Sequence, residues 1–368
     1  MQGWQYRIIK HPLQFSFVAN TSRGPLTERP TWFLLLKHSE LDNFGIGEFG
    51  IIKGLSPEDH EDLEAIAHQQ ISKWISFLPE PSFALHEQDR IYHIRQHIDA
   101  NLPSLQFAAE TAWQDLVLGG VQQIYPSSFL DGSSSITING LIWMDGIPEM
   151  TRQLEEKLVR GFKTIKVKIS DANWDQEFDF LKKIRRITDS NRITLRVDAN
   201  GAFSLKRARE IMTELHGLKI HSIEQPIKAG KIDQMASLCK NHEMPVALDE
   251  ELIGVTTAEA QEALLDTICP QYLVLKPSLL GGISACRTWI KLAEKRNIGW
   301  WVTSALESNV GLNAIAQFVA TTKATIPQGL GTGQLYTNNI AGPLALDGEN
   351  LYYKPNNPLA LDPLVNWS

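Results

Sequence analysis

Two lysines, Lys166 and Lys168, lie two residues apart in the apolar run Ile165-Lys166-Val167-Lys168-Ile169. Alternate residues of a β-strand point to one face, so this run directs both ammonium groups away from the three aliphatic side chains. On a strand with one solvated face, such a pair would simply be exposed to water. Inside a barrel, a buried ammonium group needs a partner or a chemical role, and a desolvated lysine is a good general base.

Three later runs end in a carboxylate, one strand-helix unit apart. They are Arg196-Val197-Asp198-Ala199-Asn200, Ser222-Ile223-Glu224-Gln225-Pro226 and Ala247-Leu248-Asp249-Glu250. Equivalent positions on neighbouring barrel strands lie side by side, so we expect Asp198, Glu224 and Asp249 to converge. Clustered carboxylates repel one another and need a cation between them. Ligands that are all oxygen favour Mg²⁺, or Mn²⁺ in its place.

A third lysine, Lys276, ends the next run, Tyr272-Leu273-Val274-Leu275-Lys276-Pro277. We expect it across the mouth of the barrel from Lys168. A single acid at a strand end could equally be a structural residue. Three acids in register favour a metal site. Two lysines flanking three acids match proton abstraction beside a substrate carboxylate. The metal ion would bind that carboxylate and stabilise the enediolate, and a lysine would remove the α-proton.

The elements that must position these residues begin near residue 135. From there, short β-branched runs alternate with helical patterns, which predicts parallel strands joined by helices. Eight such runs favour a (β/α)8 barrel, an α/β fold whose catalytic groups lie where strands end. The expected strands are 140–144, 164–169, 193–197, 220–223, 245–248, 272–275, 299–303 and 324–326, and helical patterns cover 174–187, 205–215, 283–295 and 310–320.

The chain before the barrel has a different pattern. Alternating runs at 6–18 and 31–37 precede helical patterns at 57–74 and 102–118, which is typical of a small α+β domain. We therefore expect an α+β capping domain over 1–132 and the catalytic barrel over 133–339. The stretch after Gly342 contains four prolines, too many for another strand-helix unit, so the tail from about 340 to 368 should return to the capping domain.

The composition is that of an ordinary folded protein, with 43% hydrophobic and 21% charged residues. The net charge of −7 offers no positive field for a phosphate backbone, so nucleic acid is not expected as a partner. With no bilayer-spanning run and no signal-peptide pattern, we predict a cytoplasmic protein with no membrane contact. The three cysteines form no CxxC pair and are expected to be interior thiols.

Together, the Lys-x-Lys strand, the three acids and Lys276 resemble the signature of the enolase superfamily, in the branch similar to muconate lactonising enzyme. The resemblance covers nearly the whole chain, since members have a modified barrel and an α+β capping domain completed by the tail. Within the branch, the sequence looks most like the o-succinylbenzoate synthase family of menaquinone biosynthesis. The supporting segments are Thr21-Ser22-Arg23-Gly24-Pro25-Leu26, Gly45-Ile46-Gly47-Glu48, Ser304-Ala305-Leu306-Glu307-Ser308 and Gly329-Leu330-Gly331-Thr332-Gly333.

This resemblance implies a lyase that dehydrates 2-succinyl-6-hydroxy-2,4-cyclohexadiene-1-carboxylate, a small-molecule substrate, to o-succinylbenzoate and water. Lys168 would take the α-proton and return it to the departing hydroxide, while Lys276 would hold its charge against the ring. Lys166 would lower the pKa of Lys168 by its like charge. Arg196 is equally well explained by an ion pair inside the barrel. Supporting or substrate-binding contacts are expected from Asn200, Arg196, Arg23, Ser304, Glu307 and Gly329.

Two alternatives remain. The N-succinylamino acid racemases and dipeptide epimerases of the same branch use the two lysines as opposed acid and base. Dipeptide epimerases resemble one another in an Asp-x-Asp pair after strand eight, and the acid-free segment 328–334 counts against them but not against a racemase. A non-catalytic barrel would leave buried lysines and converging acids without a purpose. Glu251, after Asp249-Glu250, is expected to alter the shape of the mouth.

Overall fold

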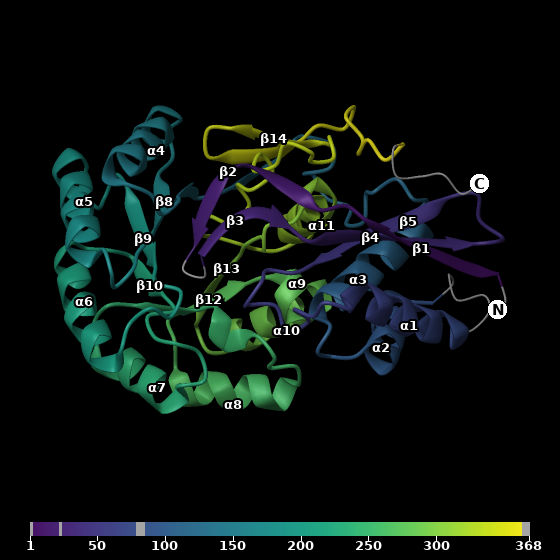
Figure 1. Cartoon of the computed structure of the whole chain (residues 1–368), viewed down its shortest axis with the longest axis horizontal. Helices are drawn as coiled ribbons and strands as arrows, with labels where there is room; N and C mark the ends of the chain where they lie inside the picture. The colour runs from purple at the N-terminus through teal and green to yellow at the C-terminus, as the bar shows by residue number, and fades with distance from the viewer. Residues whose placement is uncertain (1–2, 22–23, 79–84, 363–368) are drawn as a thin grey trace.

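The computed structural model describes residues 3–21, 24–78 and 85–362. Its amino-terminal part contains an antiparallel sheet in the order β1 (Trp4–Lys10), β4 (Thr31–His38) and β5 (Phe44–Gly50). Helices α1 (Leu63–Ser76) and α3 (Pro103–Val117) lie against this sheet, and α2 (Glu87–His97) packs on these two helices (Figure 1). Helix α3 can approach β5 closely because Gly45 and Gly47 lack side chains: a Cβ on Gly47 would lie 2.0 Å from the Ala108 oxygen.

Three elements of this part were missed by the sequence patterns: β3 (Gly24–Arg29), β5 and α2. Helix α2 buries only Arg90 and Ile94, so it has no apolar stripe for periodicity to detect. A separate hairpin of β2 (Leu13–Thr21) and β3 (Gly24–Arg29) extends from the first sheet toward the barrel (Figure 1). The hairpin is anchored there because the Ser16 N–H donates to the Leu335 oxygen at 2.8 Å.

The larger part is a curved sheet of seven parallel strands whose order follows the chain, with helices along its outer side (Figure 1). The strands are β7 (Gly140–Ile142), β8 (Thr164–Lys168), β9 (Thr194–Asp198), β10 (Ser222–Glu224), β11 (Val246–Leu248), β12 (Tyr272–Leu275) and β13 (Gly299–Val302). The helices are α4 (Ile147–Val159), α5 (Trp174–Ile187), α6 (Leu205–Gly217), α7 (Ile232–Asn241), α8 (Ala258–Ile268), α9 (Pro277–Leu280), α10 (Ile283–Glu294) and α11 (Asn309–Ala320). The fold is therefore the α/β barrel architecture that the sequence predicts.

The eighth strand, expected at 324–326, does not form. The sheet is instead closed by single bridges, which pair Gln328 with Ile138 and Gly329 with Thr303. Pro327 has no N–H to donate to a strand ladder. At the next residue, Gln328, the side-chain oxygen accepts from the Val302 N–H at 2.8 Å. One proline thus reduces the last strand to isolated contacts.

Inward and outward residues alternate along the strands as the apolar patterns predict. Val274 and Trp301 pack with Ala247 in a small cluster inside the barrel, whereas Trp300 belongs to the main core with the helices. Cys239 and Cys286 are buried as expected, but Cys269 is exposed. That cysteine ends helix α8 in the left-handed conformation (φ 52°), at the surface end of the helix.

The tail contacts both parts of the chain. Strands β14 (Leu344–Asp347) and β15 (Asn350–Tyr353) form a sheet with β6 (Ser135–Thr137), which precedes the first barrel strand. Further on, Leu359 and Leu361 pack in one cluster with Phe33 and Leu35 of β4. None of the helices in the described part of the chain has the length and apolar character needed to cross a membrane.

Glu48 joins the amino-terminal sheet to the barrel. It is 1% exposed and accepts hydrogen bonds from Arg29 and from the N–H groups of Ser308 and Gly311, each at 2.9 Å, where helix α11 begins. Replacing it by glutamine removes the carboxylate that is ion-paired with the buried Arg29 guanidinium. We therefore expect Glu48→Gln to lower the free energy of unfolding by about 3–5 kcal/mol, measured by urea denaturation. The exposed Glu61→Gln should change it little, and an equally small effect of Glu48→Gln would contradict the prediction.

Candidate active site

A cavity of about 790 Å³ lies at the carboxyl ends of the barrel strands. Lys166, Lys168 and Asp198 line it from β8 and β9, and Lys276 lines it from the end of β12. The β2–β3 hairpin covers it with Ser16, Phe17 and Val18, among other residues. Phe17 is held there by an edge-on contact with the Trp143 ring, with centroids 5.7 Å apart. The cavity therefore has an apolar cover and a charged floor.

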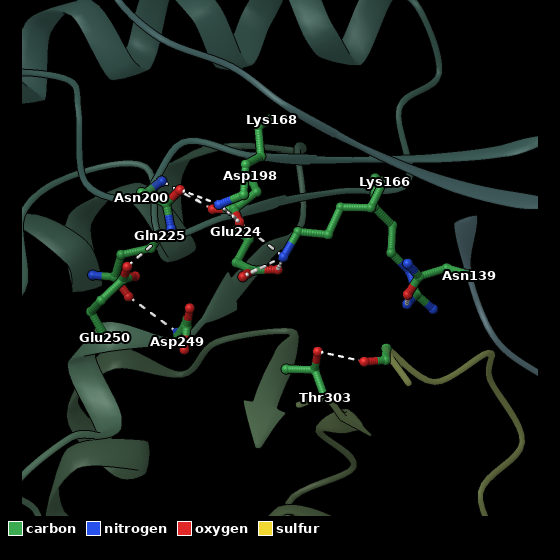
Figure 2. Close-up of polar contacts among 12 residues, drawn as sticks. Asn139, Lys166, Lys168, Asp198, Asn200, Glu224, Gln225, Asp249, Glu250 and Thr303 are labelled. Carbon is green, nitrogen blue, oxygen red and sulfur yellow. Dashed lines mark hydrogen bonds and ion pairs between the residues drawn. The ribbon is translucent and has the colours of Figure 1, made fainter. Parts of the chain in front are cut away.

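Lys166 lies between two carboxylates: that of Asp198, which lines the cavity, and that of Glu224, which is not among the lining residues (Figure 2). Its Nζ is 2.9 Å from Asp198 Oδ2 and 2.7 Å from both carboxylate oxygens of Glu224. Both acids are register partners at the ends of β9 and β10, and both are 2% exposed or less. Burial works against the ammonium form, but these two carboxylates prevail and raise the pKa of Lys166. The side chain is therefore a fixed positive charge here.

The two acids are affected differently by the same surroundings. Burial opposes ionisation of Asp198, but Lys166 and Lys168 prevail and hold its pKa well below the usual range. For Glu224, burial and the neighbouring Asp198 charge outweigh Lys166 and raise the pKa to about 8. Burial and the like charge of Asp198 therefore make Glu224 the acid of this pair that is harder to ionise.

Lys168 contacts a neutral amide more closely than a carboxylate. Its Nζ donates to Asn200 Oδ1 at 2.8 Å, whereas Asp198 Oδ2 is 3.4 Å away. Asn200 adopts φ 44°, a left-handed conformation that asparagine tolerates, and its N–H donates to Asp198 Oδ1 at 3.0 Å. The turn after β9 therefore directs the Asn200 amide toward the lysine at the end of β8.

Lys276 forms an ion pair with Asp249 Oδ2. Burial lowers the pKa of Lys276 by itself, but Asp249, Glu250 and Glu224 outweigh it and raise the pKa. Gln225, wholly buried after β10, orients the turn that bears Asp249 because its Oε1 accepts from the Asp249 N–H at 3.1 Å. The two lysines at the ends of β8 and β12 therefore have unequal surroundings.

The remaining expected residues divide into two groups. Ser304 and Gly329 line the cavity, and Ser304 Oγ is 2.7 Å from the Thr332 hydroxyl. Glu307, wholly buried, accepts from the Ala305 N–H at 2.7 Å, and burial raises its pKa. Glu307 is not among the side chains that line the cavity. Arg23 lies outside the described residues.

Arg196 lies one layer beneath Asp198 on β9, and it does not line the cavity either. Its guanidinium carbon is 4.1 Å from the centroid of the Trp301 ring, and it donates to the Pro327 oxygen at 2.9 Å. Burial lowers its pKa to about 10. Its described contacts are therefore those of a residue that ties the barrel interior to the bridge closing the sheet.

Glu251 was expected to alter the shape of the mouth, but its side chain turns away from the mouth. Its side chain accepts from the Gly230 N–H at 2.8 Å and from Gln225 Nε2 at 3.1 Å. Its neighbour Glu250, which the sequence patterns did not select, lines the cavity instead and accepts from Asn200 Nδ2 at 3.1 Å. The only sequence signal for Glu250 is its place next to Asp249 at a strand end.

Asp198, Glu224 and Asp249 offer the all-oxygen donor set that suits a hard divalent ion. In their present positions, no three carboxylate, histidine or cysteine side chains of the described residues form a group that could hold an ion. The ammonium groups of Lys166 and Lys276 compensate the acids instead. Three buried carboxylates at neighbouring strand ends, with two ammonium groups beside them, fit a divalent cation in the chemistry of their donor atoms.

Comparison with known proteins gives consistent results. Residues 149–356 match the family described as enolase C-terminal domain-like. An o-succinylbenzoate synthase of Desulfotalea psychrophila (strain LSv54) is 43% identical over 366 residues, which cover 95% of this chain and 98% of that protein. An N-succinylamino acid racemase of Thermus thermophilus is 29% identical over 323 residues, which cover 84% and 80% of the two chains.

Among solved structures, the crystal structure of MenC from Desulfotalea psychrophila LSv54 aligns with a TM-score of 0.81 and 40% sequence identity. The alignment covers 95% of this chain and 100% of that one. The likeness therefore extends beyond the barrel into the amino-terminal part.

Proposed function

The chain belongs to the enolase superfamily, and from that premise we propose that it acts as an o-succinylbenzoate synthase. The reaction is the syn dehydration of 2-succinyl-6-hydroxy-2,4-cyclohexadiene-1-carboxylate to o-succinylbenzoate, a step of menaquinone biosynthesis. The proposal is supported by 43% identity to an enzyme of that name over nearly the full length. The racemase alternative rests on a more distant relative at 29% identity.

The observation that favours dehydration is the unequal environment of two lysines. Lys276 is ion-paired with Asp249, a carboxylate. Lys168 has a neutral amide as its nearest partner. A syn elimination uses one face of the substrate and therefore needs one proton carrier and one fixed charge. A racemase needs two proton carriers, one on each face.

We propose that Asp198, Glu224 and Asp249 hold a divalent metal ion, Mg²⁺ with Mn²⁺ as a substitute. Enzymes of this superfamily depend on divalent metals. When bound, such an ion would polarise the substrate carboxylate and make the adjacent proton more acidic. Lys166 would remain beside these acids as a permanent charge near that carboxylate.

Lys168 would move the proton in both halves of the reaction. As the neutral amine, it would take the proton from ring carbon 1, beside the carboxylate. The C–O bond at ring carbon 6 would then break, the ring would become aromatic, and the departing hydroxide would take the same proton back as water. No oxidant or second reactant is needed. Lys276 would stay protonated and stabilise the electron-rich ring by a cation–π contact.

We propose a division of the chain into a capping domain, residues 1–132 with the tail from about 340 to 368, and a catalytic barrel domain, residues 133–339. The packing of Leu359 and Leu361 on β4 supports the assignment of the tail. The β2–β3 hairpin would then exclude water, since Phe17 and Val18 cover the cavity.

The direct test is an assay of the purified chain with the cyclohexadiene substrate, with and without Mg²⁺. We expect metal-dependent formation of o-succinylbenzoate, followed by its ultraviolet absorbance. The same enzyme is offered D- and L-N-succinylamino acids. Efficient racemisation with negligible aromatisation would replace the synthase proposal by the racemase.

Substitutions of Lys276 separate the two reactions further. Lys276→Arg keeps a cation at the ring and should retain measurable dehydration, whereas Lys276→Ala removes the charge and should lose about 10²- to 10³-fold in kcat. For a racemase, each lysine variant would still exchange the α-proton of one enantiomer in deuterated water. Nuclear magnetic resonance of both enantiomers measures that exchange, and single-enantiomer exchange at wild-type rates in Lys276→Ala would contradict the fixed-charge role.

A further inference from the structure

A chain of two hydrogen bonds links Glu250 to Lys168 (Figure 2). Glu250 Oε1 accepts from Asn200 Nδ2 at 3.1 Å, and Asn200 Oδ1 accepts from Lys168 Nζ at 2.8 Å. Glu250, Asn200 and Lys168 all line the same cavity. The lysine at the end of β8 is therefore connected to the turn after β11 by way of the turn after β9.

The carboxylate determines which way the amide faces. An ionised carboxylate can only accept hydrogen bonds, so Glu250 selects the NH₂ end of Asn200. The carbonyl oxygen of Asn200 must then face Lys168. If the amide were reversed, its NH₂ group would donate toward the lysine and occupy the lone pair of the neutral amine.

The acceptors around Lys168 also set the direction of that lone pair. A neutral amine has two N–H bonds and one lone pair. Asn200 Oδ1 and Asp198 Oδ2 lie 2.8 Å and 3.4 Å from Nζ, and both are acceptors. When they take the two N–H groups, the lone pair is left pointing away from both, toward the cavity that the side chain lines.

We propose that Glu250 is a positioning residue: through Asn200, it directs the lone pair of Lys168 toward the substrate proton. This inference rests on the proposed function, since it assigns Lys168 the proton transfer. Glu250 touches neither reacting atom in this role. It also lies close enough to Lys276 to help raise the pKa of that lysine, so the test must separate the route through Asn200 from the route through Lys276.

The test uses Glu250→Gln, alone and together with Asn200→Asp. A glutamine side chain can present either its oxygen or its NH₂ group to Asn200, so the Asn200 amide is no longer held in one orientation. We therefore expect kcat to fall about 10- to 100-fold, with KM within about twofold of wild type. In the double variant, the glutamine introduced by Glu250→Gln can donate to the new carboxylate, which offers only acceptors to Lys168. We therefore expect Asn200→Asp/Glu250→Gln to recover at least about tenfold in kcat over Glu250→Gln. The exposed Glu259→Gln on α8 is the matched control.

Three outcomes would overturn the inference: unchanged kcat in Glu250→Gln, no recovery in the double variant, or a loss confined to KM. The second would assign Glu250 to Lys276 instead. Circular dichroism checks that each variant folds. If Glu250→Gln lowered kcat only by disturbing the fold, a second substitution at Asn200 would not be expected to restore kcat. Failure of the proposed function is distinguishable, because wild-type enzyme would then form no o-succinylbenzoate. In that case, the rates of Glu250→Gln and of the double variant relative to wild type would be measured on α-proton exchange of N-succinylamino acids.

Discussion

Lys168→Ala is expected to lower kcat for dehydration by about 10⁴-fold, because one side chain serves as both base and acid and general acid–base catalysis is typically worth about 10²–10⁴ per step. No described neighbour offers an equivalent amine: Lys166 is held by Asp198 and Glu224, and Lys276 by Asp249. The measurement is the initial rate of o-succinylbenzoate formation at saturating substrate and Mg²⁺.

The control for this variant is Lys206→Ala, which removes an exposed lysine on α6 and should leave the rate unchanged. Substrate affinity is measured separately by equilibrium dialysis, and we expect it to change little, since Lys168 acts on a proton. A rate within about tenfold of wild type in Lys168→Ala would exclude this lysine as the base.

Asp249→Ala is expected to lower turnover by about 10³-fold or more and to abolish its dependence on Mg²⁺, because a bound ion supplies several kcal/mol of charge stabilisation. The same result is expected for Asp198→Ala and Glu224→Ala. Activity alone does not separate lost metal from lost ion pairing with Lys276, so calorimetric titration with Mg²⁺ or Mn²⁺ is the second measurement. Each variant should bind the ion more weakly.

Asp233→Ala on α7 removes an exposed aspartate and provides the control. Far-ultraviolet circular dichroism should be unchanged in all four variants, because the three acids lie at or just after strand ends rather than in the apolar core between strands and helices. Retained activity and unchanged metal affinity in Asp249→Ala would contradict the assignment of that acid.

Local patterns predicted much of this molecule because their physical causes are local. The alternation in Ile165-Lys166-Val167-Lys168-Ile169 fixes which side chains share a face, and the parallel register then aligns Lys168 with Asp198 and Asp198 with Glu224. The helical pattern over 174–187 coincides with α5 because its apolar stripe must be buried. Proteins with these patterns have a barrel whose strand ends meet, so the sequence predicted that Lys166, Lys168, Asp198 and Lys276 would lie together at the cavity.

The sequence could not predict contacts between distant turns. Nothing local distinguishes Glu250, which reaches the cavity, from Glu251, which turns toward Gly230. The difference arises because Gln225, from another strand end, accepts from the N–H groups of Asp249 and Glu251 and sets the path of the turn between them. The absence of the eighth strand is a second example. The isolated bridges at Gln328 and Gly329 depend on partners from distant segments, Ile138 and Thr303.

By itself, then, the sequence determined the strand-helix order, the inward face of each strand and the identity of the charged residues at the strand ends, because hydrophobic periodicity acts over a few residues. The tertiary structure alone decided which partner each lysine contacts. Lys166 pairs with Asp198 and Glu224, Lys276 pairs with Asp249, and Lys168 donates most closely to the Asn200 amide. Pairing energies depend on distance and burial, and both are set only when segments far apart in the chain pack together.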